Sequence, residues 1–319
     1  MRLLFAGTPE VALPSLRALL DSPHEVVGVL TRPDAPSGRG RSLRPSPVKA
    51  LALEAGLPVL TPTTLRDDAV HQQLRDLAPD VAPVVAYGNL VPRAALEIPA
   101  HGWLNLHFSL LPAWRGAAPA QRAVLAGQRE TGMSVFRLEE GLDTGDMLAT
   151  ASTDIGEYET AGQLLDRLAV EGAPLLLDAL DALASGTATF TPQDHAAATH
   201  AAKLSPAEAR IDWTRPAAEL SAHIRGMSPD PGAWTTLAGD RFKILALTRP
   251  PEHPNLPAGR LAATRKHLLV GTGTGVLALE TVAPAGKRPM RGADWARGAG
   301  LTETTTFEQP RSEQAGEQA

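Results

Sequence analysis

Short apolar runs that alternate with helix-like stretches constrain the fold of the first half of this chain more than any other feature. Four runs read as strands: Leu3–Ala6, Val26–Leu30, Asp80–Ala86 and Gly102–His107. The first helix is predicted to have Thr8 as its N-cap and Pro9 as its first residue, and to end near Leu20. This alternation predicts an α/β fold with a doubly wound, mostly parallel, Rossmann-like sheet.

The second half has a different pattern. An apolar-periodic helix is predicted for Thr160–Ala184, and an irregular stretch follows it. From about Ala207 the chain is rich in Pro and Gly, with β-like runs at Phe242–Leu247, His267–Gly271 and Val276–Thr281. Such spacing predicts a smaller, OB-like β-barrel, in which Gly271–Gly275 is a hairpin turn. We therefore expect a catalytic domain at 1–189, a linker at 190–206, the barrel domain at 207–308 and a disordered tail at 309–319 within the polar stretch 305–319.

Composition excludes several classes of function. The chain has 319 residues, which fits two domains, and it has no cysteine, so disulfides, thiolate nucleophiles and Cys-ligated zinc are excluded. The His101/His107 and His195/His200 pairs do not have the spacing of zinc ligands, and no metal is expected. Gly7-Thr8-Pro9 lacks the glycine pattern of a dinucleotide site. No run is long and apolar enough to span a bilayer, so we expect a cytoplasmic protein without membrane contact.

Charge differs between the two halves. Residues 1–206 carry 16 basic and 23 acidic side chains, whereas residues 207–308 carry 13 and 10. The net charge of −5 argues against polyanion binding by the whole surface. A mildly basic second domain remains compatible with a nucleic-acid contact, although so small an excess also arises by chance.

Three polar residues form a candidate catalytic set. Asn105 and His107 are two apart on a predicted strand and therefore face the same side, and Asp143 lies in the glycine-bounded turn Gly141–Gly145. An amide can stabilise the oxyanion formed when an amine attacks a formyl carbon, and an imidazole can accept the proton of the amine. Asp143 can orient His107 or relay the proton through water. Taken alone, the Asn-x-His pair is more typical of an asparagine in a strand-end turn and a structural histidine than of a catalytic pair.

Two loops are candidate binding segments. Ser109, Leu110, Leu111 and Pro112 form a tight exit from the strand, whose backbone groups can hold a flat heteroaromatic ligand. The stretch 31–49 is a Pro- and Gly-rich arm that carries Arg39, Arg41, Arg44 and Lys49. Basic arms of this kind contact phosphate backbones, although a solvated loop fits the composition equally well. We expect the arm to lack fixed structure in the absence of nucleic acid.

Taken together, these segments resemble the folate-dependent formyltransferases, and within that family the branch that acts on methionyl-tRNA. The resemblance extends to about residue 308. Besides the segments above, it rests on Phe5–Pro9, Gly38–Gly40, Pro45–Lys49, Val85–Gly88, Leu204–Ser205, Glu208–Trp213 and Pro284–Lys287.

The resemblance implies a function and a set of site residues. It implies 10-formyltetrahydrofolate as the formyl donor, the α-amino group of methionyl initiator tRNA as the acceptor, and a monomeric enzyme of translation initiation without a metal. It implies catalysis by Asn105, His107 and Asp143. It places the folate against Ser109, Leu110, Leu111 and Pro112, near Ala86, Tyr87 and Gly88, and the arm with Arg39 at the acceptor end of the tRNA, while the second domain helps to hold the tRNA.

Three positions depart from the family pattern, and three other functions remain open. Phe108 replaces a small residue, Ala113 replaces a basic residue, and Asp230 stands in a run that is normally Asn-Pro-Trp-Pro-like. The alternatives are a formyltransferase for a small amine, such as glycinamide ribonucleotide or an amino-sugar nucleotide, a formyltetrahydrofolate hydrolase, and a noncatalytic tRNA- or folate-binding protein. The arginine-rich arm argues against the first, and the intact catalytic set argues against the last.

Overall fold

The computed structural model describes residues 1–37, 42–252 and 254–309, and the chain divides into two compact units. The first unit comprises Met1–Pro119, Glu130–Asp154 and Leu165–Ala201, and the second comprises Ala120–Arg129, Ile155–Leu164 and Ala202–Ala319. Two short segments inside the expected catalytic domain thus belong to the second unit. The reason is packing, because Leu125 and Tyr158 contact the core of the second unit.

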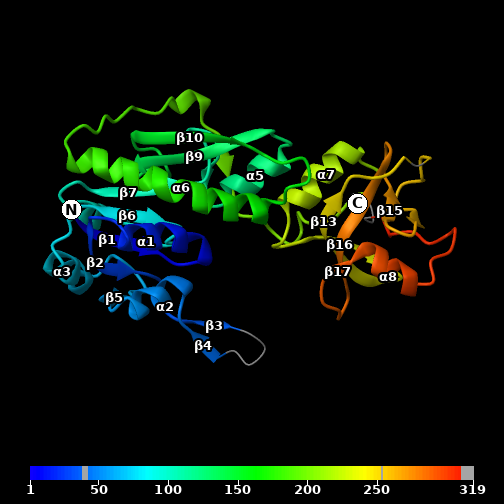
Figure 1. Cartoon of the computed structure of the whole chain (residues 1–319), viewed down its shortest axis with the longest axis horizontal. Helices are drawn as coiled ribbons and strands as arrows, with labels where there is room; N and C mark the ends of the chain where they lie inside the picture. The colour runs from blue at the N-terminus through cyan, green and yellow to red at the C-terminus, as the bar shows by residue number, and fades with distance from the viewer. Residues whose placement is uncertain (38–41, 253, 310–319) are drawn as a thin grey trace, which may run out of the picture. The chain divides into compact units, whose positions relative to one another are not determined.

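A seven-stranded sheet in the order β10-β9-β7-β6-β1-β2-β5 forms the centre of the first unit (Figure 1). All pairs from β7 to β5 are parallel, whereas β9 and β10 run antiparallel to their neighbours. The predicted doubly wound sheet is therefore confirmed, with an antiparallel addition at one edge. The strands are β1 (Arg2–Gly7), β2 (Glu25–Leu30), β5 (Val59–Leu60), β6 (Ala82–Val85), β7 (Trp103–His107), β9 (Glu130–Arg137) and β10 (Met147–Asp154).

Helices pack along this sheet. The helical elements between residues 1 and 184 are η1 (Glu10–Ala12), α1 (Leu13–Leu20), α2 (Pro47–Glu54), α3 (Asp68–Asp76), α4 (Arg93–Leu96), α5 (Pro119–Leu125) and α6 (Ala161–Ala184). Helix α6 matches the prediction, and its Gly172 lies so close to Leu106 of β7 that a Cβ would be 2.9 Å from the leucine side chain. The predicted N-cap is wrong: the Thr8 hydroxyl instead donates to the Tyr87 carbonyl at 2.7 Å, and a 3-10 turn precedes α1.

The expected linker is mostly bound to the first unit. Residues 190–201, called the strap below, contain η2 (His195–Ala197) and β11 (His200–Ala201), and β11 pairs with β8 (Arg115–Gly116). Thr191 and Met147 exchange two backbone hydrogen bonds of 2.8 and 2.9 Å. Because its backbone is paired with two other segments, the strap belongs to the fold rather than to a connection between domains.

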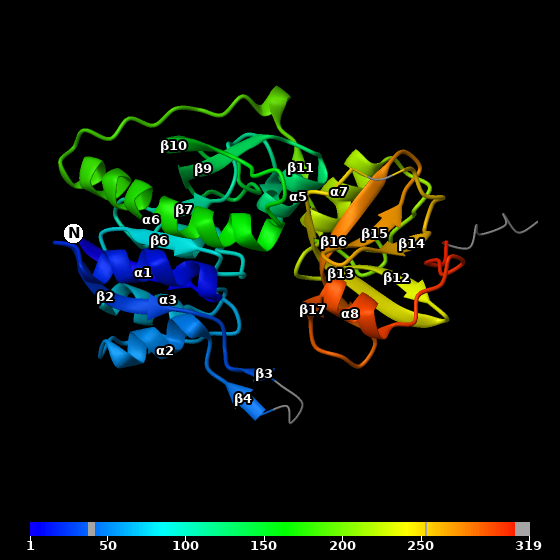
Figure 2. The same cartoon turned by 45° about the vertical axis from the view of Figure 1, so that its right-hand side comes forward.

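An antiparallel sheet in the order β12-β13-β16-β15-β14 forms the second unit, and β17 pairs with β16 (Figure 2). The elements are α7 (Ala217–Gly226), β12 (Ala233–Leu237), β13 (Asp240–Thr248), β14 (Leu261–Ala263), β15 (Leu268–Gly271), β16 (Val276–Pro284), β17 (Met290–Arg291) and α8 (Gly292–Gly298). The three strands predicted in this region are confirmed, and the turn between β15 and β16 is the predicted hairpin.

The segment Thr305–Glu308 joins the two edges of this sheet. Glu308 bridges Thr236 of β12, and Thr306 bridges Arg260, which directly precedes β14. Phe307 is 1% exposed and stacks on the ring of Trp213. Backbone pairing and burial thus hold residues 305–308, although their polar composition suggests disorder, and they close the predicted barrel. Of the expected tail, residues 310–319 lie outside the described part.

Candidate active site

Strand β7 presents Asn105 and His107 on one face at its carboxyl end, as the alternation of side chains requires. His107 is 6% exposed, and its ring meets that of Phe136 edge to face. Asn105 is half-buried, and no hydrogen bond with the described residues engages its side chain. The amide is therefore available to a ligand in the adjoining cavity.

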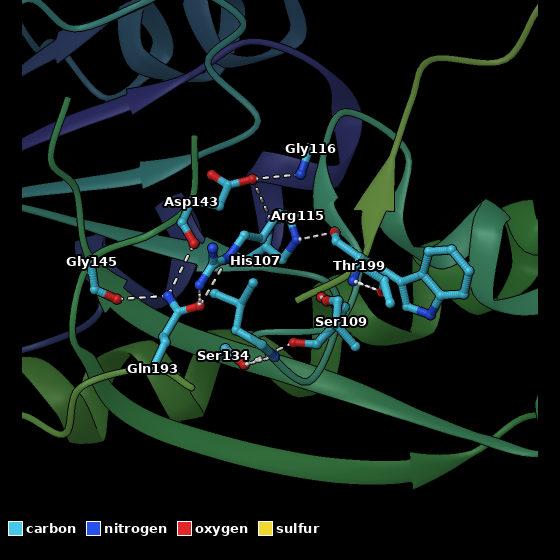
Figure 3. A network of polar contacts seen from close by, with 12 residues as sticks. His107, Ser109, Arg115, Gly116, Ser134, Asp143, Gly145, Gln193 and Thr199 are labelled. Atoms are coloured by element: carbon cyan, nitrogen blue, oxygen red, sulfur yellow. Dashed lines mark hydrogen bonds and ion pairs between the residues drawn. The ribbon is translucent and has the colours of Figure 1, made fainter. Parts of the chain in front are cut away.

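Two neighbours define the protonation of His107 (Figure 3). Its Nε2 lies 2.9 Å from the Trp114 carbonyl oxygen, which can only accept, so Nε2 carries the hydrogen. In the neutral ring Nδ1 is then an acceptor, and it lies 3.8 Å from Asp143 Oδ2. Burial lowers the pKa of His107 below its usual value, while the charge of Asp143 and the Trp114 carbonyl oppose that shift. The arrangement therefore holds a neutral base at Nδ1 next to a carboxylate.

The turn that carries Asp143 is closely packed. Asp143 has φ 51°, a left-handed conformation that costs energy for a residue with a Cβ. Its two glycines are required by contact, because a Cβ at Gly141 would meet the Thr144 side chain and one at Gly145 would meet the Arg137 carbonyl. The Gly116 N–H donates to Asp143 Oδ2 at 2.7 Å. A carboxylate fixed in this way keeps its position relative to His107.

All three predicted catalytic residues line one cavity of about 590 Å³ in the first unit. Its wall contains apolar side chains together with a few polar and charged ones, as is usual for small-molecule sites. The lining residues are Val84, Ala86, Tyr87, Gly88, Asn89, Leu90, Val91, Leu96, Asn105, Leu106, His107, Phe108, Gly116, Ala117, Pro119, Leu138, Glu139, Glu140, Gly141, Leu142 and Asp143.

The two segments expected against the folate differ in their surroundings. Ala86, Tyr87 and Gly88 follow β6 and line the cavity, with left-handed φ values of 48° and 85° at Ala86 and Gly88. Tyr87 is 2% exposed, and burial raises the pKa of its hydroxyl.

Ser109, Leu110, Leu111 and Pro112 are not among the residues that line this cavity. The Ser134 hydroxyl donates to the Ser109 carbonyl at 2.8 Å and accepts the Leu111 N–H at 3.0 Å, while Ser109 Oγ donates to the Ala113 carbonyl. The Ser109 carbonyl and the Leu111 N–H are thus bonded within the protein, and the expected contact of this segment with a folate stays a prediction.

The basic arm is partly described. Arg39 and Arg41 lie outside the described residues. On either side of them, β3 (Ala35–Ser37) and β4 (Ser42–Arg44) pair antiparallel, so these described parts of the arm have fixed structure where none was expected. Arg44 is exposed, whereas Lys49 lies in α2 with its Nζ 2.8 Å from Asp34 Oδ1.

Three departures from the family pattern have different settings. Phe108 is 6% exposed and lines the cavity. The backbone carbonyl of Ala113, not its side chain, is the group in use, because it accepts the Ser109 hydroxyl. Asp230 is exposed in the second unit, and nothing in the structure explains its substitution.

Sequence reasoning missed two residues that support this site. Arg115 is 5% exposed, and Gln193 in the strap is also 5% exposed; the two side chains are hydrogen-bonded to each other (Figure 3). For Arg115, the one signal in the sequence was its place in the run Trp114–Gly116, where an arginine stands next to a glycine. Nothing in the polar strap marks Gln193 as buried.

The described residues contain neither a cluster of metal ligands nor a helix that could cross a membrane. No group of three or more His, Cys, Asp or Glu side chains there can hold a metal ion. Within the same residues, no helix combines the length and the apolar character that crossing a membrane requires.

Comparison with known proteins points in one direction. Residues 1–180 match the model of the formyl transferase family, and residues 203–300 match that of the formyl transferase C-terminal domain. A methionyl-tRNA formyltransferase of Streptomyces coelicolor is 51% identical over 95% of this chain and 98% of the relative. One of Parafrankia is 54% identical over 93% and 97%.

A solved structure shares the fold. The N-formyltransferase from Helicobacter canadensis, in complex with folinic acid and dTDP-3-aminofucose, superposes with a TM-score of 0.64 at 17% identity. The match covers 87% of this chain and 98% of that protein.

Proposed function

This chain belongs to the formyl transferase family, and from that premise we propose that it transfers the formyl group of 10-formyltetrahydrofolate to the α-amino group of methionyl initiator tRNA. The product is formylmethionyl-tRNA for translation initiation. The observation that carries the proposal is the meeting of an amide, an imidazole and a carboxylate, from Asn105, His107 and Asp143, at one cavity. The names of relatives about half identical to this chain support the choice of acceptor.

A folate donor fits this cavity. Its volume of about 590 Å³ lies within the usual range for small-molecule sites, and Val84, Leu96 and Leu138 give it apolar walls suited to a flat ring system. Glu139 and Glu140 offer acceptors for ring N–H groups. We place the folate ring between these residues and the Ala86–Gly88 turn, with the formyl group toward Asn105.

The reaction then needs no covalent enzyme intermediate. The amine lone pair forms a bond to the formyl carbon, and the carbonyl electrons move onto the oxygen. The Asn105 amide donates a hydrogen bond to that oxyanion. The proton of the amine passes to His107 Nδ1, the acceptor of the neutral ring. When the intermediate collapses, the bond to the folate N10 breaks and N10 receives the proton.

Asp143 stabilises the positively charged imidazolium that forms on His107 during this reaction. Protonation at Nδ1 makes an imidazolium that faces Asp143 Oδ2 at 3.8 Å, and the carboxylate stabilises that charge. The distance is longer than a hydrogen bond, so the interaction is electrostatic or passes through a water. The Gly116 N–H keeps the carboxylate in place during the step.

Basic residues in both units are proposed to hold the tRNA. In the arm these are Arg44 and Lys49, together with Arg39 and Arg41, which contact phosphates at the acceptor end. In the proposed C-terminal domain, residues 207–308, the guanidinium carbons of Arg210 and Arg241 lie 5.3 and 4.2 Å from the centre of the Trp234 ring. A guanidinium stacked on an aromatic ring keeps N–H donors available for phosphate oxygens.

We infer in addition that the enzyme acts as a monomer in the cytoplasm, where its acceptor is used in translation. Light scattering at micromolar concentration tests the monomer, and a mass of twice 33.6 kDa would contradict it.

The experiment that tests the function follows radiolabelled formyl from 10-formyltetrahydrofolate to three acceptors offered separately. These are methionyl initiator tRNA, methionyl elongator tRNA and glycinamide ribonucleotide. Label on initiator tRNA alone supports the proposal. Label on the small amine would overturn the acceptor, folate consumption without labelled acceptor would indicate a hydrolase, and no consumption would indicate a binding protein.

A further inference from the structure

The strap holds a side chain that the mechanism above does not use. Gln193 lies two residues after Thr191, whose backbone pairs with Met147, and its side chain is buried at 5% exposure. Burying an amide is costly unless its donors and acceptors are bonded. The hydrogen-bond partners of Gln193 therefore account for the burial of its amide.

The Gln193 amide joins two parts of the active site (Figure 3). Its Oε1 accepts from Arg115 Nε and Nη2 at 3.1 and 2.7 Å. Its Nε2 donates to the carbonyls of Asp143 and Gly145 at 3.0 and 2.7 Å. Because a guanidinium only donates and a carbonyl only accepts, the orientation of the amide is fixed and all its bonding capacity is used.

The same network reaches Asp143 from a second side. Arg115 is bonded through its backbone N–H to the Thr199 carbonyl at 2.9 Å, and its Nη2 donates to His195 Nδ1 at 3.0 Å. The next residue, Gly116, donates its N–H to the Asp143 carboxylate. Asp143 is thus held at its carbonyl by Gln193 and at its carboxylate by the residue that follows Arg115.

We propose that Gln193 is a positioning residue that holds the Asp143 turn so that the carboxylate faces His107. The inference rests on the proposed function, because it gives a role to the residue that supports the base. Asp143 adopts a left-handed backbone conformation, which persists only where surrounding contacts impose it. Two donors from one side chain to the carbonyls of Asp143 and Gly145 supply such contacts.

The inference predicts how Gln193→Met behaves, since methionine has a similar length and cannot form these bonds. We expect kcat to fall at least tenfold, with the KM for methionyl-tRNA within twofold of the wild-type value, because the arm and the second unit are untouched. The same substitution at Gln163 is the control. Gln163 accepts the Thr160 N–H at the start of α6 and does not line the cavity, so we expect its replacement to leave kcat unchanged.

A second readout separates positioning from general loss of structure. The charge of Asp143 raises the pKa of His107, so displacement of the carboxylate lowers that pKa further. The ionisable groups at the cavity are Tyr87, His107, Glu139, Glu140 and Asp143, and Arg115 lies beside Gln193. Partial unfolding reduces the amplitude of the pH profile, whereas displacement of Asp143 moves the acid limb of kcat/KM to lower pH.

A second variant keeps the test valid if Gln193→Met does not fold. Gln193→Glu keeps an acceptor for Arg115 but cannot donate to the two carbonyls when ionised. We expect the folded variant to lose kcat at least tenfold. Wild-type kcat in either folded variant would overturn the inference, as would a Gln193→Met acid limb at the wild-type position.

Titration of His107 by NMR in wild-type protein and Gln193→Met needs no acceptor. If the wild-type protein formylates no tRNA, the proposed function fails, but a lower His107 midpoint in the variant still supports the positioning role. An identical midpoint overturns that role whatever the substrate.

Discussion

The Asp143 turn and the basic arm are both loops rich in glycine, yet they are built differently. Asp143 is held by hydrogen bonds at its carbonyl and at its carboxylate, and its neighbours Gly141 and Gly145 are in close contact with other segments. In the described part of the arm, the exposed residues Leu43 and Arg44 lie on the three-residue strand β4, which pairs with β3. The contrast fits a division of labour: groups that move protons are fixed in advance, and groups that meet a large substrate stay exposed.

The largest expected effect comes from removing the base. His107→Ala leaves no acceptor for the proton of the amine, so we expect kcat to fall by about 10²–10⁴-fold. The Kd for methionyl-tRNA stays within about twofold, since the recognition surfaces are unaltered. Single-turnover formylation and filter binding on the same preparation check this. A loss of tRNA binding as large as the loss of rate would contradict the separation of the catalytic site from the tRNA-binding arm.

Asp143→Asn is expected to have the next largest effect. The amide oxygen can still accept the Gly116 N–H, so the turn stays in place, while the charge opposite Nδ1 is lost. We expect kcat to fall by about 10²-fold, comparable to the loss of one electrostatic stabiliser. Rates near those of the wild-type enzyme would remove Asp143 from the mechanism.

The acid limb of kcat/KM is expected to shift in a defined direction in the wild-type enzyme and in Asp143→Asn. Burial lowers the pKa of His107, so the base form is present at neutral pH and is lost as pH falls through a value below 6.5. In wild-type enzyme the acid limb of kcat/KM therefore has its midpoint below 6.5. In Asp143→Asn it lies lower still, because the charge that raised the pKa is absent. An acid midpoint at or above 6.5 in the wild-type enzyme would contradict the assignment of the base.

The arm should affect binding rather than rate. Arg44→Ala is expected to raise the KM for methionyl-tRNA about tenfold and to reduce the slope of log Kd against log salt by about one. Lys49→Ala should have a smaller effect, because Lys49 Nζ is already paired with Asp34 at 2.8 Å. Binding titrations from 50 to about 200 mM salt compare the two. A larger effect at Lys49 would place the phosphate contact at the base of the arm.

The smallest expected effect is in the second unit. Arg241→Ala removes a cation stacked on Trp234, and we expect the Kd for tRNA to rise about two- to fivefold without a change in kcat. Arg297→Ala is the control, because Arg297 is paired with Asp294 on α8. Equal effects of the two substitutions would show a general charge effect rather than a contact.

The strands around the site were predictable because buried parallel strands leave continuous apolar runs, as in Leu3–Ala6 and Val26–Leu30. Asn105 and His107 were placed on one face by alternation alone. The strap and residues 305–308 were missed because backbone pairing with distant segments orders them, and such pairing leaves no periodic pattern. Gln193 was missed for the same reason: its burial depends on Asp143 and Arg115, which are 50 and 78 positions away in the chain.

The most direct test of this division of labour is the single-turnover rate of formyl transfer at saturating methionyl-tRNA and donor, for Asn105→Ala and Arg44→Ala side by side. The account predicts that Asn105→Ala loses about 10²–10³-fold at saturation, because an oxyanion donor is missing. It predicts that Arg44→Ala recovers the wild-type rate once enough tRNA is bound. A normal saturated rate for Asn105→Ala, with a deficit that persists for Arg44→Ala, would contradict it.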